Sequence, residues 1–191
     1  VLAWLKGPTV VGLGLIGIAL AVAYSLPPLK LASRGVGELT IAAGFGMLPV
    51  MGAAWLQTGV FDLSALLVSV PTAMWVTGIL LINEVPDLRA DELAGKRTWP
   101  VRFGVGGTRV IYAGLHVVAL AATVAMVLRG QLHWGVLGLS VPIFALGLLA
   151  ARGIAAASGP GRDGLRASIE KTLGIHALGS AWIAVWAWFG G

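Results

Sequence analysis

The chain has 191 residues, of which 58% are hydrophobic and 11% charged, and its formal net charge is +5. Soluble domains carry about 25% charged residues, so this composition indicates a membrane protein. The absence of cysteine excludes disulfides, thiolate nucleophiles and cysteine-ligated metals. The positive charge does not point to nucleic acid as a partner, because the basic residues stand between apolar spans, where they determine membrane topology.

Six apolar segments are long enough to cross a hydrocarbon core, which takes about 20 helical residues. None alternates as a strand does, and backbone in lipid must satisfy its own hydrogen bonds, so each segment predicts a helix. We therefore expect an all-α fold, a polytopic transmembrane helical bundle with six helices in this chain. The predicted helices cover residues 8–24, 36–56, 62–83, 107–128, 133–151 and 169–189.

Local signals refine some of these helices. Asp62 opens the run DLSALLVSVPTAMW and is placed to cap the third helix. Pro49, Pro71 and Pro142 lie inside spans and predict kinks, which membrane helices tolerate.

The basic residues predict the orientation of the bundle. The loops at 25–35, 84–106 and 152–168 should lie on one side of the membrane. With the adjoining helical turns, they hold eleven of the thirteen lysine and arginine residues, and only Lys6 and Arg129 lie on the other side. The positive-inside rule therefore predicts a multi-pass protein of the inner (cytoplasmic) cell membrane whose charged loops face the cytoplasm.

Residues 83–104, NEVPDLRADELAGKRTWPVRFG, place four acids and four bases between two apolar helices. Acids contribute little to orientation, so topology alone does not explain them. A solvated, self-paired loop is the plain alternative. Asn83, Asp87 and Asp91 are spaced i, i+4 and i+8, which predicts one stripe along a helix that runs out of the membrane. Pro86 fits the first turn of such a helix or a kink at its mouth.

Aligned carboxylates without histidine or cysteine suit Mg²⁺, which prefers oxygen ligands and completes its shell with substrate phosphates. Eight helical residues span about 12 Å, so a single ion does not bridge Asn83 to Asp91, whereas two ions that share a diphosphate do. Lys96 and Arg97 follow closely, where they are placed to hold phosphate oxygens. In a membrane, such a site predicts a substrate with a phosphorylated head and an apolar tail, such as a prenyl diphosphate.

The same stretch resembles the second aspartate-rich motif of the UbiA superfamily of membrane prenyltransferases, with Asp-x-x-x-Asp at 87 and 91 and Gly-Lys-Arg-Thr at 95–98. The ending GKRT-x-x-VR-x-G is most similar to the branch that prenylates 1,4-dihydroxy-2-naphthoate in menaquinone synthesis. Residues 24–38, YSLPPLKLASRGVGE, are similar to the family's Tyr-Ser-x-Pro-Pro-x-(Lys/Arg) loop, which faces the same cavity.

The family has nine transmembrane helices, with one aspartate-rich motif after the second and another after the sixth. The resemblance implies that residues 1–191 are a single transmembrane prenyltransferase domain that corresponds to helices four to nine. It also implies that the first three helices, with the first Asn-Asp-x-x-Asp motif, are missing from this sequence. We expect the segment alone to lack catalytic competence, because half of the metal site is then missing.

The resemblance also implies roles for residues of both loops. Mg²⁺-dependent ionisation of a polyprenyl diphosphate would be followed by attack of an aromatic carbon on the prenyl cation. In the dihydroxynaphthoate branch, the acceptor's carboxylate is lost as well. Asp87 and Asp91 would be the catalytic metal ligands, Asn83 would support the metal or contact the diphosphate, and Tyr24 would border the acceptor or the cation. The implied diphosphate clamp comprises Lys96, Arg97, Lys30 and Arg34.

Several of these residues have plainer alternatives. Lys30 and Arg34 are juxtamembrane bases that would also serve to set orientation, and Tyr24 also fits an interfacial aromatic belt. For His116 and His176, which lie inside predicted spans, a hydrogen bond to a helix carbonyl is favoured over catalysis. No dedicated general base is evident.

Other functions are also open. In a membrane transporter, Asn83, Asp87 and Asp91 would line an ion path, but these residues stand at the cytoplasmic end rather than at the midplane where carriers bind. A purely structural subunit would have no use for four acids in one loop. Within the enzyme class, the acceptor stays open between dihydroxynaphthoate and those of related branches, which are 4-hydroxybenzoate, homogentisate, chlorophyllide, haem and glycerol phosphates.

Overall fold

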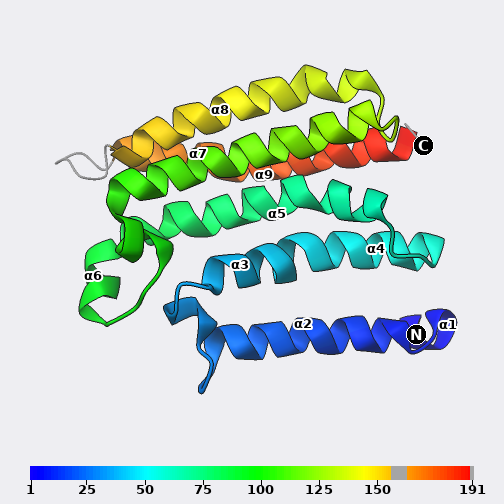
Figure 1. Cartoon of the computed structure of the whole chain (residues 1–191), viewed down its shortest axis with the longest axis horizontal. Coiled ribbons are helices and arrows are strands. Elements are labelled where there is room, and N and C mark those ends of the chain that lie inside the picture. The colour runs from blue at the N-terminus through cyan, green and yellow to red at the C-terminus, as the bar shows by residue number, and fades with distance from the viewer. Residues whose placement is uncertain (156–162, 190–191) are drawn as a thin grey trace.

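A computed structural model describes residues 1–155 and 163–189 (Figure 1). These residues form helices and turns without a strand, which confirms the predicted all-α class. Two short 3₁₀ helices and one π-helical segment join the α-helices; they are η1 (Leu31–Ser33), η3 (Trp134–Val136) and η2 (Ala42–Met47). The α-helices are α1 (Leu2–Lys6), α2 (Thr9–Ser25), α3 (Gly37–Ile41), α4 (Leu48–Thr58), α5 (Leu63–Glu84), α6 (Leu88–Leu93), α7 (Trp99–Leu128), α8 (Leu137–Ala155) and α9 (Asp163–Phe189).

Within the described residues, five helical stretches are long and apolar enough to cross a membrane, which confirms the predicted membrane bundle. They are Gly37–Thr58, Leu63–Glu84, Trp99–Leu128, Trp134–Ala155 and Gly164–Phe189. The remaining predicted span forms α2, whose 17 residues fall short of the about 20 that a bilayer core takes. The long helices lie side by side, with α6 and the loop before α3 at one end and the turn between α4 and α5 at the other (Figure 1).

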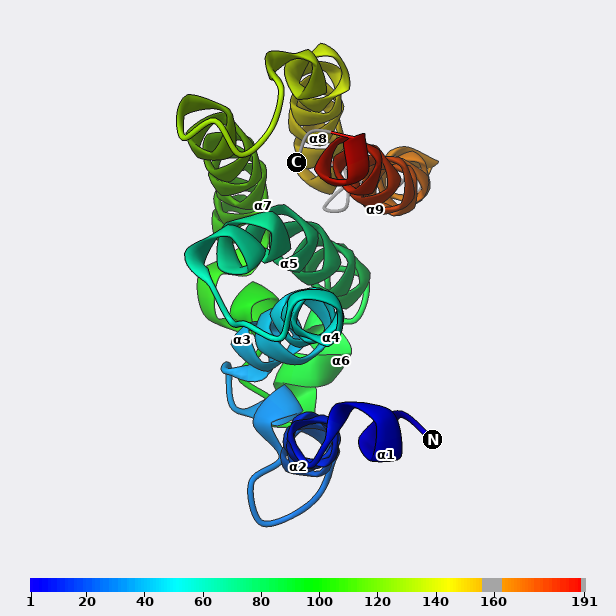
Figure 2. The ribbon, with the colours of Figure 1, turned by 90° about the vertical axis from the view of Figure 1, so that its right-hand side faces the viewer.

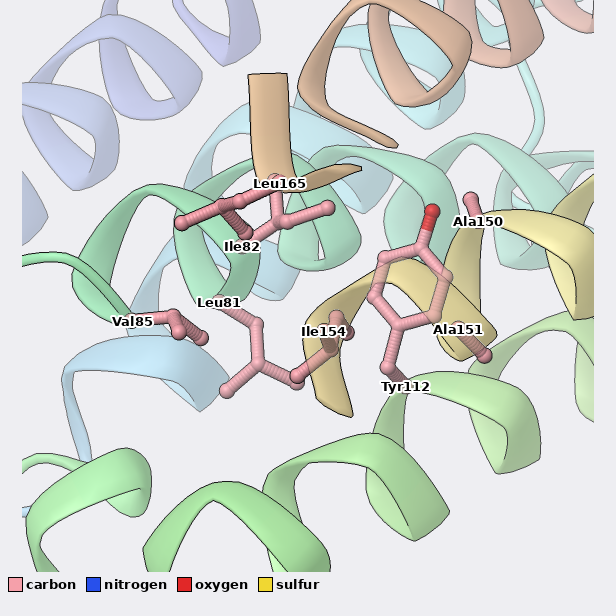
Figure 3. Packing of buried hydrophobic residues seen from close by; sticks show 8 residues of the cluster. All are labelled: Leu81, Ile82, Val85, Tyr112, Ala150, Ala151, Ile154 and Leu165. Atoms are coloured by element: carbon pink, nitrogen blue, oxygen red, sulfur yellow. The ribbon is translucent and has the colours of Figure 1, made fainter. Parts of the chain in front are cut away.

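The core lies where α5, α7, α8 and α9 pack on one another, with α3 and α4 beside α5 and α2 outermost (Figure 2). Leu81 of α5, Tyr112 of α7 and Ile154 of α8 are buried in one cluster (Figure 3). The Tyr112 hydroxyl lies 2.6 Å from Oγ1 of Thr172 on α9, so the polar atom of this buried ring has a partner. Lipid tails are as apolar as the core, so there is no hydrophobic driving force between helices in a membrane. Close packing and hydrogen bonds between helices hold the bundle together instead.

The second predicted span is interrupted in its middle by the π-helical segment η2. Pro49 follows η2, has no N–H to donate, and crowds the carbonyl of the preceding turn. A π-helical turn is wider than an α-turn and relieves such a mismatch. Gly46 of η2 packs on α5, where a Cβ would overlap the backbone of Ala73. The deviation predicted at Pro49 therefore takes the form of a π-helical segment with a close helix contact.

The helix boundaries agree with the prediction in some places and differ in others. The predicted cap is confirmed, because Oδ1 of Asp62 accepts the N–H of Ala65 at 2.7 Å. The seventh helix begins at Trp99 rather than at residue 107, and a non-helical residue, Gly104 (φ 65°, ψ −179°), separates its first turn from the span. The last helix begins at Asp163 rather than at residue 169.

Candidate active site

The charged loop after α5 folds into the short helix α6 at one end of the bundle (Figure 1). Helix α5 ends at Glu84, and α6 begins only after a turn. The prediction that one helix carries Asn83, Asp87 and Asp91 is therefore wrong, whereas the alternative of a kink at Pro86 agrees with the break. Pro86 accounts for the break, because it lacks a backbone N–H and its ring clashes with the preceding turn.

Asp91 and Lys96 form an ion pair in this loop. Asp91 is only 8% exposed, and its Oδ1 accepts a hydrogen bond from the Lys96 ammonium at 2.6 Å. The Lys96 N–H also donates to the Asp91 carbonyl at 2.9 Å, in a turn where Gly95 has a φ of 72°. The hydrogen bond to Asp91 raises the pKa of Lys96, so this side chain stays protonated at neutral pH.

The other predicted ligands at this end of the bundle do not join that pair. Asn83, Asp87 and Arg97 are exposed. Over residues 1–155 and 163–189, no three histidine, aspartate or glutamate side chains stand close enough together to hold a metal ion. The structure thus brings Asp91 to Lys96 and leaves the other three side chains accessible to a ligand at the same end of the bundle.

The loop before α3 docks on the charged loop. The Arg97 N–H donates to the carbonyl of Ser33 at 2.9 Å, and the Arg102 guanidinium donates to the carbonyl of Arg34 at 2.9 Å. Gly35 lies between these contacts with a φ of 76°, and a Cβ on it would overlap the Arg97 carbonyl and the Arg102 guanidinium. Glycine is therefore required at this position by both conformation and space.

The predicted clamp residues of the first loop are both exposed bases. Lys30 is exposed and adopts a left-handed conformation with a φ of 43°. Arg34 is exposed, and its guanidinium donates to the Pro28 carbonyl of its own loop at 2.7 Å. Neither side chain forms an ion pair with a described residue.

Tyr24 is half-buried near the end of α2 and lines a cavity of about 340 Å³. The cavity lies between α2 and the stretch formed by α3 and η2. Its wall is mostly apolar and includes two glycines, Gly17 and Gly44. The remaining lining residues are Leu20, Ala21, Ser25, Thr40, Ile41 and Phe45.

Sequence reasoning missed Glu38, which lies in α3 and is 1% exposed. Its Oε1 accepts the backbone N–H of Trp99 at 2.5 Å, so it contacts the end of the charged loop from another helix. A signal was present in the sequence, because Glu38 is the only acid before Asp62 and falls inside a predicted span. Ionisable residues in such spans are functional by default.

His116 is buried, and its ring lies 4.9 Å from that of Tyr112, centroid to centroid. Gly147 of α8 leaves room for the imidazole, because a Cβ there would meet its Cγ at 2.5 Å. The favoured hydrogen bond to a helix carbonyl is not made through Nδ1, which has no partner among the described residues. His116 thus lies within the helix interface, and it is absent from the contacts of the charged loop.

The family model of the UbiA prenyltransferase family matches residues 1–167. A 1,4-dihydroxy-2-naphthoate octaprenyltransferase of Mycobacterium tuberculosis is 33% identical over 187 residues, which cover 98% of this chain and 60% of that protein.

Two further relatives match over shorter stretches. A UbiA prenyltransferase domain-containing protein 1 of Dictyostelium discoideum is 36% identical over 107 residues, 56% of this chain and 32% of the relative. A 1,4-dihydroxy-2-naphthoate octaprenyltransferase of Haemophilus influenzae is 30% identical over 123 residues, 64% of this chain and 40% of the relative. The chain thus spans 32% to 60% of the length of these curated relatives. No solved structure matches it.

Proposed function

Because the chain belongs to the UbiA prenyltransferase family, we propose that its complete protein transfers a polyprenyl group from a prenyl diphosphate to an aromatic acceptor in quinone biosynthesis. We propose 1,4-dihydroxy-2-naphthoate as the acceptor, because relatives from Mycobacterium tuberculosis and Haemophilus influenzae carry this substrate in their names. The observation that carries the proposal is the buried Asp91, paired with Lys96 beside accessible acids and bases at one end of an apolar bundle.

The proposed site binds the diphosphate head through Lys96 and Arg97. Lys96 is charged and 43% of its side chain is exposed, so its ammonium can contact a phosphate oxygen while Asp91 keeps it in place. Arg97 is exposed, with its backbone held by Ser33, which leaves the guanidinium available for the same head group. Both side chains would favour departure of the diphosphate when the allylic C–O bond breaks.

The chemistry of the donors fits magnesium shared with a substrate. Asp91 has one carboxylate oxygen engaged by Lys96, and Asp87 and Asn83 offer exposed oxygens close by in the chain. Magnesium is usually held by one or two carboxylates together with waters and substrate phosphates, which matches a sparse set of this kind better than a cage made of protein alone. We propose Asp87, Asp91 and Asn83 as its ligands. Bound there, magnesium would neutralise charge on the departing diphosphate.

The cavity beside Tyr24 supports an apolar substrate next to this head-group site. Its walls come from α2 and the α3–η2 stretch, and a prenyl chain would gain about 0.8 kcal/mol for each CH₂ removed from water. Tyr24 would present its ring to the allylic cation or to the aromatic acceptor. The new carbon–carbon bond forms between the allylic carbon and the acceptor ring, which then loses its carboxylate as carbon dioxide.

We also propose that the end with α6 faces the cytoplasm of a cell whose inner membrane the protein crosses several times. Lys30, Arg89 and Lys96 all belong to the loops at that end. The positive-inside rule assigns loops rich in such residues to the cytoplasmic side.

The experiment is a transfer assay with the full-length protein in membranes. Asp91→Asn removes the anionic charge with little change in shape, and we expect turnover to fall at least about 100-fold. Glu92→Gln is the matched control, because Glu92 neighbours Asp91 on α6 but is exposed, and we expect normal turnover. Near-normal turnover in Asp91→Asn would refute the proposed site.

A further inference from the structure

Glu38 has no role in the function proposed above, yet it is among the most deeply buried polar side chains of the structure. Burial of a carboxylate is unfavourable unless hydrogen bonds compensate for the lost water. One oxygen, Oε1, accepts the Trp99 N–H at 2.5 Å, while the other, Oε2, has no partner among the described residues. The hydrogen bond from Trp99 is therefore the contact that compensates for the burial of Glu38.

Trp99 is the first residue of α7, where helical N–H groups lack intrahelical partners. Thr98 stands at the cap position, but its hydroxyl makes no capping hydrogen bond and is buried without a partner in the described chain. Glu38, which is 61 positions away in the chain, supplies the missing acceptor. A carboxylate at a helix N-terminus is also favoured by the helix dipole.

This contact lies directly beside the bases that bind the diphosphate in the proposed function. Lys96 and Arg97 precede Trp99 by three and two residues. Lys96 is fixed to Asp91, and the backbone of Arg97 is fixed to Ser33. The segment from Lys96 to Trp99 is thus held at its beginning by one buried carboxylate and at its end by another.

We propose that Glu38 is a positioning residue, which holds the start of α7 so that Lys96 and Arg97 keep their place beside Asp91. The role of those bases rests on the proposed function, whereas the contact between Glu38 and Trp99 does not. Glu38 touches neither substrate nor metal in this proposal. Its effect on the reaction passes through the backbone of Trp99.

Conservative variants separate the hydrogen bond from the charge. In Glu38→Gln, the amide oxygen still accepts the Trp99 N–H. Its NH₂ can donate to Glu84, whose carboxyl lies beside Glu38 and whose buried Oε2 lacks a partner in the described structure. Glu38→Asp keeps the charge but is one CH₂ shorter, so it loses reach. Glu38→Ala removes the contact altogether.

The test measures KM for both substrates with the full-length protein in membranes. We expect Glu38→Ala to raise KM for the prenyl diphosphate about tenfold or more, because a hydrogen bond to a charged group is lost. KM for the aromatic acceptor should stay within about twofold, and Glu38→Gln should restore the wild-type KM for the diphosphate. If Glu38→Ala does not accumulate in membranes, Glu38→Asp takes its place, with the same direction of change.

A second arm does not depend on activity. Hydrogen exchange over residues 96–102 should become faster in Glu38→Ala or Glu38→Asp and stay unchanged in Glu38→Gln, with residues 137–155 of α8 as the unaffected reference. Wild-type protein without transferase activity would refute the proposed function, and the exchange arm would still decide whether Glu38 holds α7. Three results would each overturn the positioning role. The first is hydrogen exchange over residues 96–102 in Glu38→Ala at the wild-type rate, and the second is a KM for the diphosphate that rises as much in Glu38→Gln as in Glu38→Ala. The third is an equal rise in KM for the diphosphate and for the aromatic acceptor.

Discussion

The two sides of the bundle differ in how tightly they pack. Helices α5, α7 and α8 contain many buried residues and enclose the core around Tyr112, whereas α2 has none within the described chain. Leu15 and Ile18 of α2 are 60% and 62% exposed. The cavity beside Tyr24 lies on the loosely packed side, and Asp91 and Lys96 follow directly from the tightly packed helix α5. We infer that the tightly packed helices fix the charged groups, whereas the loosely packed side beside α2 leaves space for the apolar chain of a substrate.

The largest effect on stability is expected at the contact between the two sides. Gly46→Val places branched carbon atoms against the backbone of Ala73, where even a Cβ overlaps. We expect unfolding in detergent to become easier by about 1–3 kcal/mol or more, which is typical of overpacking. Gly114→Ala is the control, because Gly114 is an exposed helical glycine with open space around it, and it should be neutral or stabilising by up to about 1 kcal/mol. Equal stability of both variants would contradict the close contact.

A smaller effect, on activity alone, is expected in the cavity. Gly44→Leu fills part of the space beside Tyr24, and we expect kcat/KM for the prenyl diphosphate to fall about tenfold, the effect of about 1.4 kcal/mol. Gly44→Ala should be tolerated, because its Cβ would stand 3.5 Å from Leu20, an ordinary contact. Thermal stability should be unchanged in both. Full activity in Gly44→Leu would mean that the cavity does not hold a substrate.

The smallest effect is expected within the core. Tyr112→Phe removes the hydrogen bond to Thr172, whose hydroxyl still donates to the Ser168 carbonyl at 2.7 Å. We expect a loss of about 1 kcal/mol in unfolding free energy, the usual net value of such a bond, and no change in KM for either substrate. A change in KM would show that the core and the substrate region are coupled more closely than their packing suggests.

Local patterns sufficed for the helices and for one cap. Apolar runs long enough to cross a membrane predicted the bundle, and the position of Asp62 before such a run predicted its hydrogen bond to Ala65. The helix predicted over residues 62–83 ends within one residue of α5, but the helical stripe from Asn83 to Asp91 was predicted wrongly, because its regular spacing was given more weight than the effect of Pro86 on the backbone. A helical stripe is lost wherever the helix itself is broken.

Contacts between distant parts of the chain were beyond the reach of such patterns. Glu38 and Trp99 are 61 residues apart, and no local rule pairs a glutamate in an apolar span with a helix start in another loop. The contact of Arg97 with Ser33 likewise depends on how the helices are arranged. The sequences of residues 24–38 and 83–104 predicted that these two loops share one site. Which residue of one loop contacts which residue of the other was seen only in the structure.

We propose above that Asp91 and its neighbours bind a prenyl diphosphate head together with magnesium. The most direct measurement is the Kd of an unreactive prenyl diphosphate analogue for the full-length protein in lipid nanodiscs, with magnesium and with an excess of chelator. We expect the affinity of the wild-type protein to be at least about tenfold weaker in chelator, equivalent to about 1.4 kcal/mol, and we expect no such difference in Asp91→Asn. Equal affinity of the wild-type protein with and without magnesium would contradict it.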